Sequence, residues 1–583
     1  MAHPLLLAVA AVATVSLQAQ AQAQTQAQTQ TGARLNAIQA QIAALNGELR
    51  QVKRTLAARD AAIRGAQADA SRARQQSQQT EAAVAHLAPP SGFGPMDAGT
   101  RGPTMGIGAA HPDYASPKTD FSSLSVVPIT AGDQQAGATA SKGTFHIGGL
   151  TIQLGGFFEG TAIYRSRNEV TDISSNFNTG IPLRQSPQYH EGEFRGSARQ
   201  SRFAILMHGD IDPEQHVAGY AELDLQGAAG TTNSNESNSY NPRIRQAYLA
   251  YDNDAGGIHV LAGQAWSLAT MNKLGVVPRQ ENLPLTIDQQ YVPGFTWARQ
   301  TQLRIAKDFN QKYWVAASLE SPQTTYAIGP NGTGSNSGTA NYNNPGISTL
   351  TPGQAYSTDI APDVIVKFAA DPGFGHYELF GIARFMQDRV SVLGNGHSNT
   401  RLAGGVGGGV TLPVIPKILD IEARGLAGYG IGRYGTSQLP DATISPTGAP
   451  APLAAFHALV GVIGHPDPSV DLYSYVGTEQ VARKAFNTGG KAYGYGNPLY
   501  SNAGCDVELS TASCTANTSG IVQGTLGAWW RFFQGDYGTV QAGVQYSYTR
   551  RSVFKGQTAA GGGGNAGTDE NTALFSLRYL PFQ

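Results

Sequence analysis

The sequence predicts an all-β transmembrane barrel of about 16 antiparallel strands, preceded by an α-helical coiled coil. The first observation is the stretch Ile521 to Phe554, where apolar and polar residues alternate along two long segments joined by Gln534-Gly535-Asp536. Such alternation indicates strands with one apolar and one polar face. Secondly, no run of about eighteen apolar residues follows the N-terminus, which excludes membrane-spanning helices. Thirdly, short and long connections between strands alternate.

Composition agrees with this fold class and excludes others. Charged residues are 14% of the 583 residues, below the roughly 25% of soluble proteins. The formal net charge of −1 and the absence of a basic stripe argue against a nucleic-acid partner. The two cysteines, Cys505 and Cys514, are close in sequence, which favours a local disulfide in an oxidising compartment over a metal site.

Residues 1–23 are predicted to be a signal peptide. Leu5 to Leu17 is a short apolar run, and Ala19-Gln20-Ala21-Gln22-Ala23 after it offers several Ala-x-Ala cleavage frames. The alternative is a buried N-terminal helix.

Residues 33–87 are predicted to form a coiled coil, because apolar residues recur there at spacings of three and four. The seam residues are Leu35, Ile38, Ile42, Leu45, Leu49, Val52, Leu56 and Ile63. Self-association through this seam implies an oligomer, whereas a single helix packed on the barrel is the alternative. Residues 88–143 are rich in Pro, Gly, Ser and Ala without periodicity and indicate a linker or a plug.

Residues 144–583 contain sixteen candidate strands joined by seven short turns and eight longer loops. Short turns at one rim and long loops at the other are typical of outer-membrane barrels. The expected strands are Thr151–Arg167, Arg199–Ile211, Gln215–Gly227, Arg243–Asp252, Ile258–Ser267, Ala298–Asp308, Tyr313–Glu320, Asp363–Asp371, His376–Val390, Arg401–Leu412, Lys417–Arg433, Leu453–Gly464, Val470–Ala485, Ile521–Phe533, Tyr537–Phe554 and Asn571–Pro581.

Several short motifs together resemble the DcaP-type porins. They are Gly148-Gly149-Leu150, Ile152 to Phe157, Arg243 to Leu249, and Ala262 to Ser267, added to the signal peptide and the coiled coil. The resemblance spans the chain from Ala33 onward and implies a sixteen-stranded homotrimeric outer-membrane porin. It also implies a periplasmic coiled coil and a preference for small anionic solutes such as dicarboxylates.

Strand parity predicts which charged residues face the channel, because an arginine turned to lipid at mid-depth costs roughly 2–4 kcal/mol. By this rule, inward cations outnumber inward carboxylates by ten to seven. Arginine suits a carboxylate-selective pore, since its guanidinium binds a carboxylate with two parallel hydrogen bonds. The alternative is that these charges pair with one another and only support the fold. The candidate pore-lining residues are Arg202, Arg243, Arg245, Lys273, Arg279, Arg299, Arg304, Lys367, Arg384, Arg424 and Arg531.

The loop Leu268 to Trp297 is the candidate constriction. It carries Lys273 and Arg279 and is stiffer and more apolar than the other loops, so it can fold inward. The alternative is an outward surface loop or a trimer contact. Arg243 and Arg245 share their parity with outward-facing apolar residues, which leaves their placement open. The glycine run Gly405 to Gly409 indicates a bend in the wall or a close neighbour.

These observations predict a passive diffusion channel of the bacterial outer membrane, with the coiled coil in the periplasm and a preference for small anions. The expected partners are two further copies of the chain, outer-membrane lipid and lipopolysaccharide. No catalytic, cofactor or metal motif is expected. The alternatives are a general porin without solute preference, or a structural or adhesive barrel anchor whose interior is occluded.

Overall fold

A computed structural model describes residues 143–582, except 174–176, 178–179, 228–239, 345–346, 349–355, 559–562 and 565. The expected signal peptide and coiled coil, and the linker up to residue 142, lie outside the described residues. Among the described residues, no helix combines the length and the apolar composition needed to cross a membrane.

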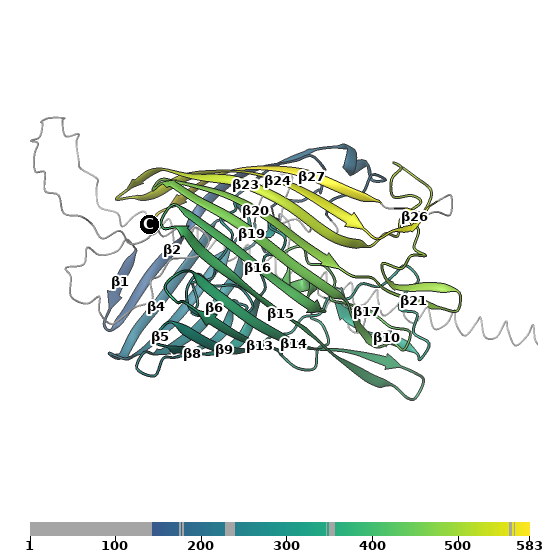
Figure 1. Cartoon of the computed structure of the whole chain (residues 1–583), viewed down its shortest axis with the longest axis horizontal. Coiled ribbons are helices and arrows are strands. Elements are labelled where there is room, and N and C mark those ends of the chain that lie inside the picture. Colours follow the sequence, from purple (N-terminus) through teal and green to yellow (C-terminus); the bar gives the residue numbers. More distant parts are fainter. Residues whose placement is uncertain are drawn as a thin grey trace, which may run out of the picture. The chain divides into compact units, whose positions relative to one another are not determined.

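Sixteen antiparallel strands form one closed barrel, which confirms the predicted fold class (Figure 1). The first strand of the wall, β2, pairs with the last, β27, for example Ile163 with Leu574, so the sheet closes on itself. The strands of the wall are β2 (Leu150–Arg165), β4 (Arg202–Asp212), β5 (Gln215–Asp224), β6 (Arg243–Asn253), β7 (Ile258–Trp266), β8 (Arg299–Phe309), β9 (Tyr313–Glu320), β13 (Asp363–Ala370), β14 (His376–Ser391), β15 (His397–Ile415), β16 (Leu419–Tyr429), β19 (Ala454–Asp467), β20 (Val470–Val481), β23 (Thr518–Gly535), β24 (Gly538–Val553) and β27 (Gly567–Leu580).

Short turns join the wall strands at one rim, for example Pro213-Glu214 between β4 and β5. The other rim carries the long loops, which contain several short elements. These are β3 (Glu193–Ser197), β10 (Thr339–Asn341), β11 (Asn343–Asn344), β12 (Ile347–Ser348), β17 (Ala442–Ile444), β18 (Pro450–Pro452), β21 (Lys484–Thr488), β22 (Lys491–Tyr495), β25 (Gly556–Gln557), β26 (Gly563–Gly564) and the 3-10 turns η2 (Pro187–His190), η3 (Gln289–Tyr291) and η4 (Gly432–Tyr434). At the short-turn rim, β1 (Thr144–Ile147) extends the sheet beside β2.

Two strands end four residues earlier than the sequence predicts. The strand expected to run to Arg433 ends at Tyr429, because Gly430 has a φ of 67° and turns the chain into the barrel. The strand expected to reach Ala485 ends at Val481. The residues after it leave the wall and form the separate hairpin β21–β22 around Gly489 and Gly490, both with positive φ.

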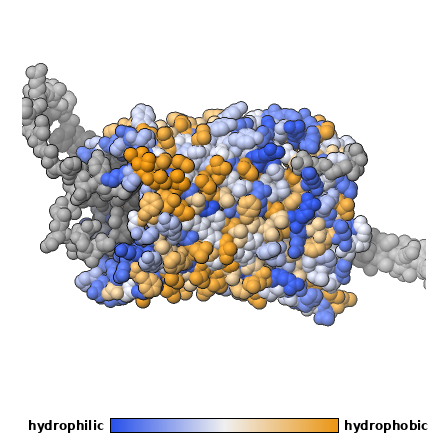
Figure 2. All heavy atoms as spheres, in the orientation of Figure 1, coloured by the Kyte–Doolittle hydropathy of each residue, from blue (hydrophilic) through white to orange (hydrophobic). Residues whose placement is uncertain are grey.

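The outer face of the wall is apolar and the inner face is polar. On β23, Trp529 is fully buried and points inward, while Trp530 is 56% exposed and points outward. Figure 2 shows hydrophobic residues gathered over the middle of one side, with hydrophilic residues towards both ends. The alternation of the strands therefore produces a belt that suits contact with lipid.

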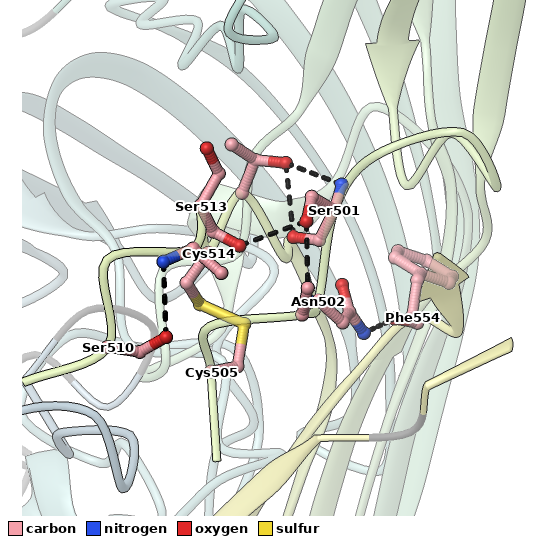
Figure 3. Close-up of a disulfide and its surroundings, with 10 residues drawn as sticks. Ser501, Asn502, Cys505, Ser510, Ser513, Cys514 and Phe554 are labelled. Carbon is pink, nitrogen blue, oxygen red and sulfur yellow. Dashed lines mark hydrogen bonds between the residues drawn. A yellow bond between two sulfur atoms is a disulfide. The ribbon is translucent and has the colours of Figure 1, made fainter. Parts of the chain in front are cut away.

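Cys505 and Cys514 form a disulfide in the loop between β22 and β23 (Figure 3). Ser501 Oγ donates a hydrogen bond to the carbonyl oxygen of Ser513 at 3.0 Å, beside the disulfide. Asn502 Nδ2 donates to the carbonyl oxygen of Phe554 at 3.0 Å. The disulfide loop is thus attached to the end of β24.

Candidate pore and inward loops

The long loop between β7 and β8, residues 267–298, lies inside the barrel, and we call it the inward loop. Leu268, Tyr291 and Phe295 are almost fully buried. The loop contains few charged residues and several prolines and aromatic residues, so it can be buried without leaving many charges unpaired. It is the loop that the sequence indicates as the constriction.

Wall residues from distant strands hold the inward loop through hydrogen bonds to its backbone. Trp529 Nε1 donates to the carbonyl oxygen of Leu285 at 2.7 Å. Arg578 donates to the carbonyl oxygen of Ile287 at 2.8 Å, while the amide of Ile287 donates to Gln545 Oε1 at 2.7 Å. Because a buried backbone group needs a partner, these side chains fix the path of the loop.

Glycines in the wall make room for the inward loop. A Cβ at Gly477 on β20 would lie 1.8 Å from the carbonyl oxygen of Pro293. A Cβ at Gly409 on β15 would lie 2.6 Å from Met271 Sδ. The glycine run of β15 therefore lies where a neighbour approaches closely, one of the two readings that the sequence offers.

A second segment, residues 430–453 between β16 and β19, also enters the barrel, and we call it the second inward loop. Tyr434 OH donates to Asp363 Oδ2 on β13 at 2.8 Å. Burial raises the pKa of the Tyr434 phenol well above its usual value, so the hydroxyl keeps its proton and remains a donor. Asp441 of this loop lies 2.9 Å from Arg384 Nη1 on β14.

Glu479 on β20 joins the two inward loops. Its fully buried carboxylate accepts the amide of Gly294 at 2.8 Å from the first loop. It also accepts the amide of Ser437 at 3.2 Å and the hydroxyl of Thr436 at 3.2 Å from the second. Glu479 is not among the residues predicted from the sequence, although it shares its strand parity with Asp471 and Tyr475, which also point inward from β20.

Four of the candidate pore residues come together on the wall formed by β4, β5, β6 and β8. We call Arg202, Arg243, Arg245 and Arg299 the arginine cluster; it surrounds two carboxylates, Glu222 and Asp224. Arg243 and Arg245 lie 2.6 and 2.9 Å from Asp224 Oδ2. Arg202 and Arg245 lie 3.6 and 3.3 Å from Glu222 Oε1.

A β-bulge places Arg245 inside the barrel. The register of β5 and β6 shifts between the pairs Glu222 with Gln246 and Leu223 with Ile244, so β6 carries one extra residue. Consequently Arg245 and Gln246 both point inward and are buried, while Ile244 points outward. The bulge decides the placement that parity alone leaves open.

In the arginine cluster, part of the positive charge is exposed to solvent, whereas the carboxylates of Glu222 and Asp224 are buried. The side chain of Arg243 is 32% exposed, whereas that of its partner Asp224 is fully buried. Arg299 is partly exposed, lies over the Trp266 ring at 5.0 Å, and has a buried Nη1 without a hydrogen-bond partner. Donor capacity is therefore left in this cluster.

Arg279, Arg304 and Lys367 form a second group around Glu281 of the inward loop, which interacts electrostatically with each of them. Lys367 Nζ lies 2.7 Å from Glu378 Oε2, with both side chains fully buried, and also donates to the carbonyl oxygen of Thr270 at 2.7 Å. This group holds the inward loop to β13 and β14.

The remaining candidates are not brought together. Arg384 pairs with Asp363 and Asp441, Arg424 with Glu422, and Arg531 with Asp471. Lys273 is half-buried and lies on the inward loop, not on a wall strand. Arg401, near the start of β15, is exposed.

The excess of positive charge that parity predicts for the wall does not extend to the buried side chains as a whole. Among the described residues, ten Arg and Lys side chains are buried, against sixteen Asp and Glu side chains. Many of these carboxylates, such as Asp441 and Glu193, lie in or beside loops, where strand parity gives no signal. A positive bias is therefore local to the arginine cluster. The same described residues hold no group of three or more His, Cys, Asp or Glu arranged to bind a metal ion.

No protein-family model and no curated protein matches this chain. Among solved structures, the outer membrane channel DcaP of Acinetobacter baumannii is similar at a TM-score of 0.51 and 16% identity, over 75% of this chain and 99% of that chain. An anion-selective porin from Comamonas acidovorans gives a TM-score of 0.39 and 9% identity, over 74% and 99%. The trimer form of OmpT from Vibrio cholerae gives 0.38 and 10%, over 74% and 99%. The likeness to DcaP confirms the expected resemblance at the level of the fold.

Proposed function

We propose that this chain is a passive diffusion channel of the bacterial outer membrane that prefers small anions, such as dicarboxylates. The observation that carries the proposal is the arginine cluster, where four guanidinium groups surround two carboxylates. Its members Arg243 and Arg299 are partly exposed, whereas the carboxylates of Glu222 and Asp224 are buried. A carboxylate solute that reaches the cluster meets donors with spare hydrogen-bonding capacity.

The fold supports the proposed location. A closed barrel leaves no unpaired strand edge in hydrocarbon, and its outward apolar belt suits a bilayer. The similar DcaP structure is described as an outer membrane channel. In this arrangement outer-membrane lipid and lipopolysaccharide surround the belt, and the short-turn rim faces the periplasm.

A homotrimer is part of the proposal. Its support is the heptad pattern of residues 33–87, in which a narrow apolar seam requires partner helices. The seam would join three copies of the chain in the periplasm.

The test is single-channel conductance of the purified full chain in planar bilayers, with a salt gradient across the membrane. Three equal conductance steps and a reversal potential on the anion side are the expected result. A reversal potential near zero would instead identify a general porin, and a potential on the cation side would contradict the anion preference.

One observation favours a second function, a barrel that serves as a structural anchor. The two inward loops occupy the interior, and Glu479 joins them across it. If they seal the barrel, the bilayer experiment gives no conductance, although the protein inserts. Shortening the inward loop by removing residues 286–292 would then open a measurable channel.

A further inference from the structure

A cavity of about 140 Å³ lies between the wall and the inward loop, towards the short-turn rim. We call it the rim cavity. Strands β4, β5, β6, β7 and β9 form one side, and residues 274–279 of the inward loop form the other. Because its lining includes the turn residues Asp254 and Gln311, the cavity lies beside the mouth and is distinct from the arginine cluster at the start of β6 and β8.

The body of the rim cavity is apolar. Its walls include Leu206, Ala250 and Trp314, which are buried side chains of three different strands. Val277 and Pro278 of the inward loop complete the lining. An apolar cavity of this volume holds a small number of poorly bonded waters, since one water takes roughly 30 Å³. A compact hydrocarbon group would replace them favourably.

In the described part of the chain, four buried nitrogen atoms of the lining residues have no hydrogen-bond partner: Arg279 Nε, His208 Nε2, His216 Nε2 and Trp314 Nε1. His208 lies close enough to Arg279 to interact with it electrostatically. The other end of the guanidinium is fixed, because Arg279 Nη1 donates to Tyr248 OH at 3.1 Å. Buried donors of this kind indicate a missing acceptor.

Of the two carboxylates at the cavity, Asp252 is hydrogen-bonded to a histidine, whereas Asp254 lies only within ion-pair distance of one. Asp252 Oδ1 lies 2.7 Å from His259 Nδ1, and Asp254 Oδ2 lies 3.5 Å from His216 Nε2. Glu281, which interacts with Arg279, is not part of the lining. Among the described residues, Arg279 is the one arginine or lysine of the lining, so the unpartnered Nε of its guanidinium marks the place for an anionic acceptor.

We propose that the rim cavity binds a solute with one carboxylate on a compact apolar or aromatic body, with the carboxylate at Arg279 and His208. The inference rests on the proposed function, in that such a solute reaches the cavity through the barrel. The proposed solute differs from a dicarboxylate in having a single carboxylate, because the cavity has one cationic group and is otherwise mostly apolar.

Isothermal titration calorimetry on the detergent-solubilised full chain tests the proposal with three probes of equal size. Benzoate has the charge and the ring, benzyl alcohol has the ring alone, and benzylammonium has the opposite charge. Benzoate is expected to bind at least about tenfold more tightly than either of the others, the value of one charge-assisted hydrogen bond. Equal binding of the three probes, tighter binding of benzylammonium, or no binding of benzoate would overturn the proposal.

Two variants with matched controls locate the site. Arg279→Gln is expected to weaken benzoate binding about tenfold or more, while Lys491→Gln, on the exposed hairpin β21–β22, leaves it unchanged. Ala250→Leu fills the cavity and abolishes binding, while Ala247→Leu on the outward face of the same strand does not. Equal losses in a variant and its control would place binding elsewhere.

Conductance of the same preparations separates this proposal from the proposed function. A channel that conducts anions but does not bind benzoate contradicts only the rim cavity. A silent barrel that still binds benzoate through Arg279 contradicts only the channel.

Discussion

Trp529 Nε1 donates a hydrogen bond of 2.7 Å to the carbonyl oxygen of Leu285, which joins the wall strand β23 to the inward loop. The next residue, Trp530, points the other way and is 56% exposed on the apolar belt. Two adjacent tryptophans thus belong to opposite faces of one strand, the interior and the lipid-facing surface.

Trp529→Phe is expected to lower the free energy of unfolding by about 1–3 kcal/mol, because it leaves the buried carbonyl of Leu285 without a donor. Trp530→Phe keeps an aromatic ring at the surface and should change it by less than about 0.5 kcal/mol. Urea titration of the detergent-folded barrel measures both. Equal effects of the two substitutions would show that the hydrogen bond does not hold the loop.

Gly477→Ala is expected to displace the inward loop, since the new Cβ would lie 1.8 Å from the carbonyl oxygen of Pro293. The displacement would weaken the hydrogen bond from the amide of Gly294 to Glu479. Hydrogen exchange measured by mass spectrometry should therefore speed up in the peptide around residue 294. Gly524→Ala is the control, because its Cβ meets nothing within 4 Å. Unchanged exchange in both variants would contradict the close contact.

Lys367→Met is expected to cost about 3 kcal/mol of folding free energy, because it leaves the buried carboxylate of Glu378 without its ammonium partner. The cost should lie at the low end for such pairs, since His376 Nε2 remains 3.0 Å from the same carboxylate. The double variant Lys367→Met with Glu378→Gln should regain most of the loss. A double-mutant cycle by chemical denaturation measures this, and additive losses would contradict a coupled pair.

Arg299→Gln is expected to reduce the ratio of anion to cation permeability roughly sevenfold. One charge acting on a permeating ion across about 7 Å of water changes its energy by about 0.6 kcal/mol, with opposite signs for an anion and a cation, so the ratio changes by about 1.2 kcal/mol. Lys484→Gln removes one charge from the exposed hairpin β21–β22 and should leave the ratio unchanged. Reversal potentials in a salt gradient give the ratio. A larger effect of Lys484→Gln would move selectivity from the arginine cluster to the outer loops.

Replacing both Cys505 and Cys514 with serine is expected to destabilise the disulfide loop locally by roughly 2–3 kcal/mol, the loop-closure value for a ring of about ten residues. The wall itself should unfold as before, because the disulfide lies outside it. Limited proteolysis should therefore cleave near residue 510 faster, at an unchanged midpoint of barrel unfolding. A lowered midpoint would show that this loop supports the wall.

The wall could be predicted from the sequence because lipid outside and polar groups inside impose one strict period on every strand. For example, the strand expected at Leu453–Gly464 is β19, which pairs with β16 and β20 over most of its length. The inward course of residues 267–298 also had a signal, since the loop is apolar and rich in proline. The alternation of the wall strands and the composition of the inward loop are both visible within short stretches of the sequence.

The charges of the interior could be predicted only in part. The inward orientation of Arg245 depends on a bulge that parity does not show. The pairing of Asp441 with Arg384 depends on the path of the second inward loop. Parity fixes a side of the wall, whereas pairing depends on which loop returns to which strand. The local positive bias, as opposed to a general one, is therefore a property of the tertiary structure.

The hydrogen bonds that fix the inward loop connect residues far apart in sequence: Leu285 with Tyr475, 190 positions later, and Ile287 with Arg578, 291 positions later. The loop is synthesised near the midpoint of the chain, yet its partners on β20 to β27 are synthesised last. It cannot reach its final place until those strands have joined the wall, so we expect slow folding through these non-local contacts. During biogenesis the wall is therefore expected to assemble first, and the inward loop packs into its final position last.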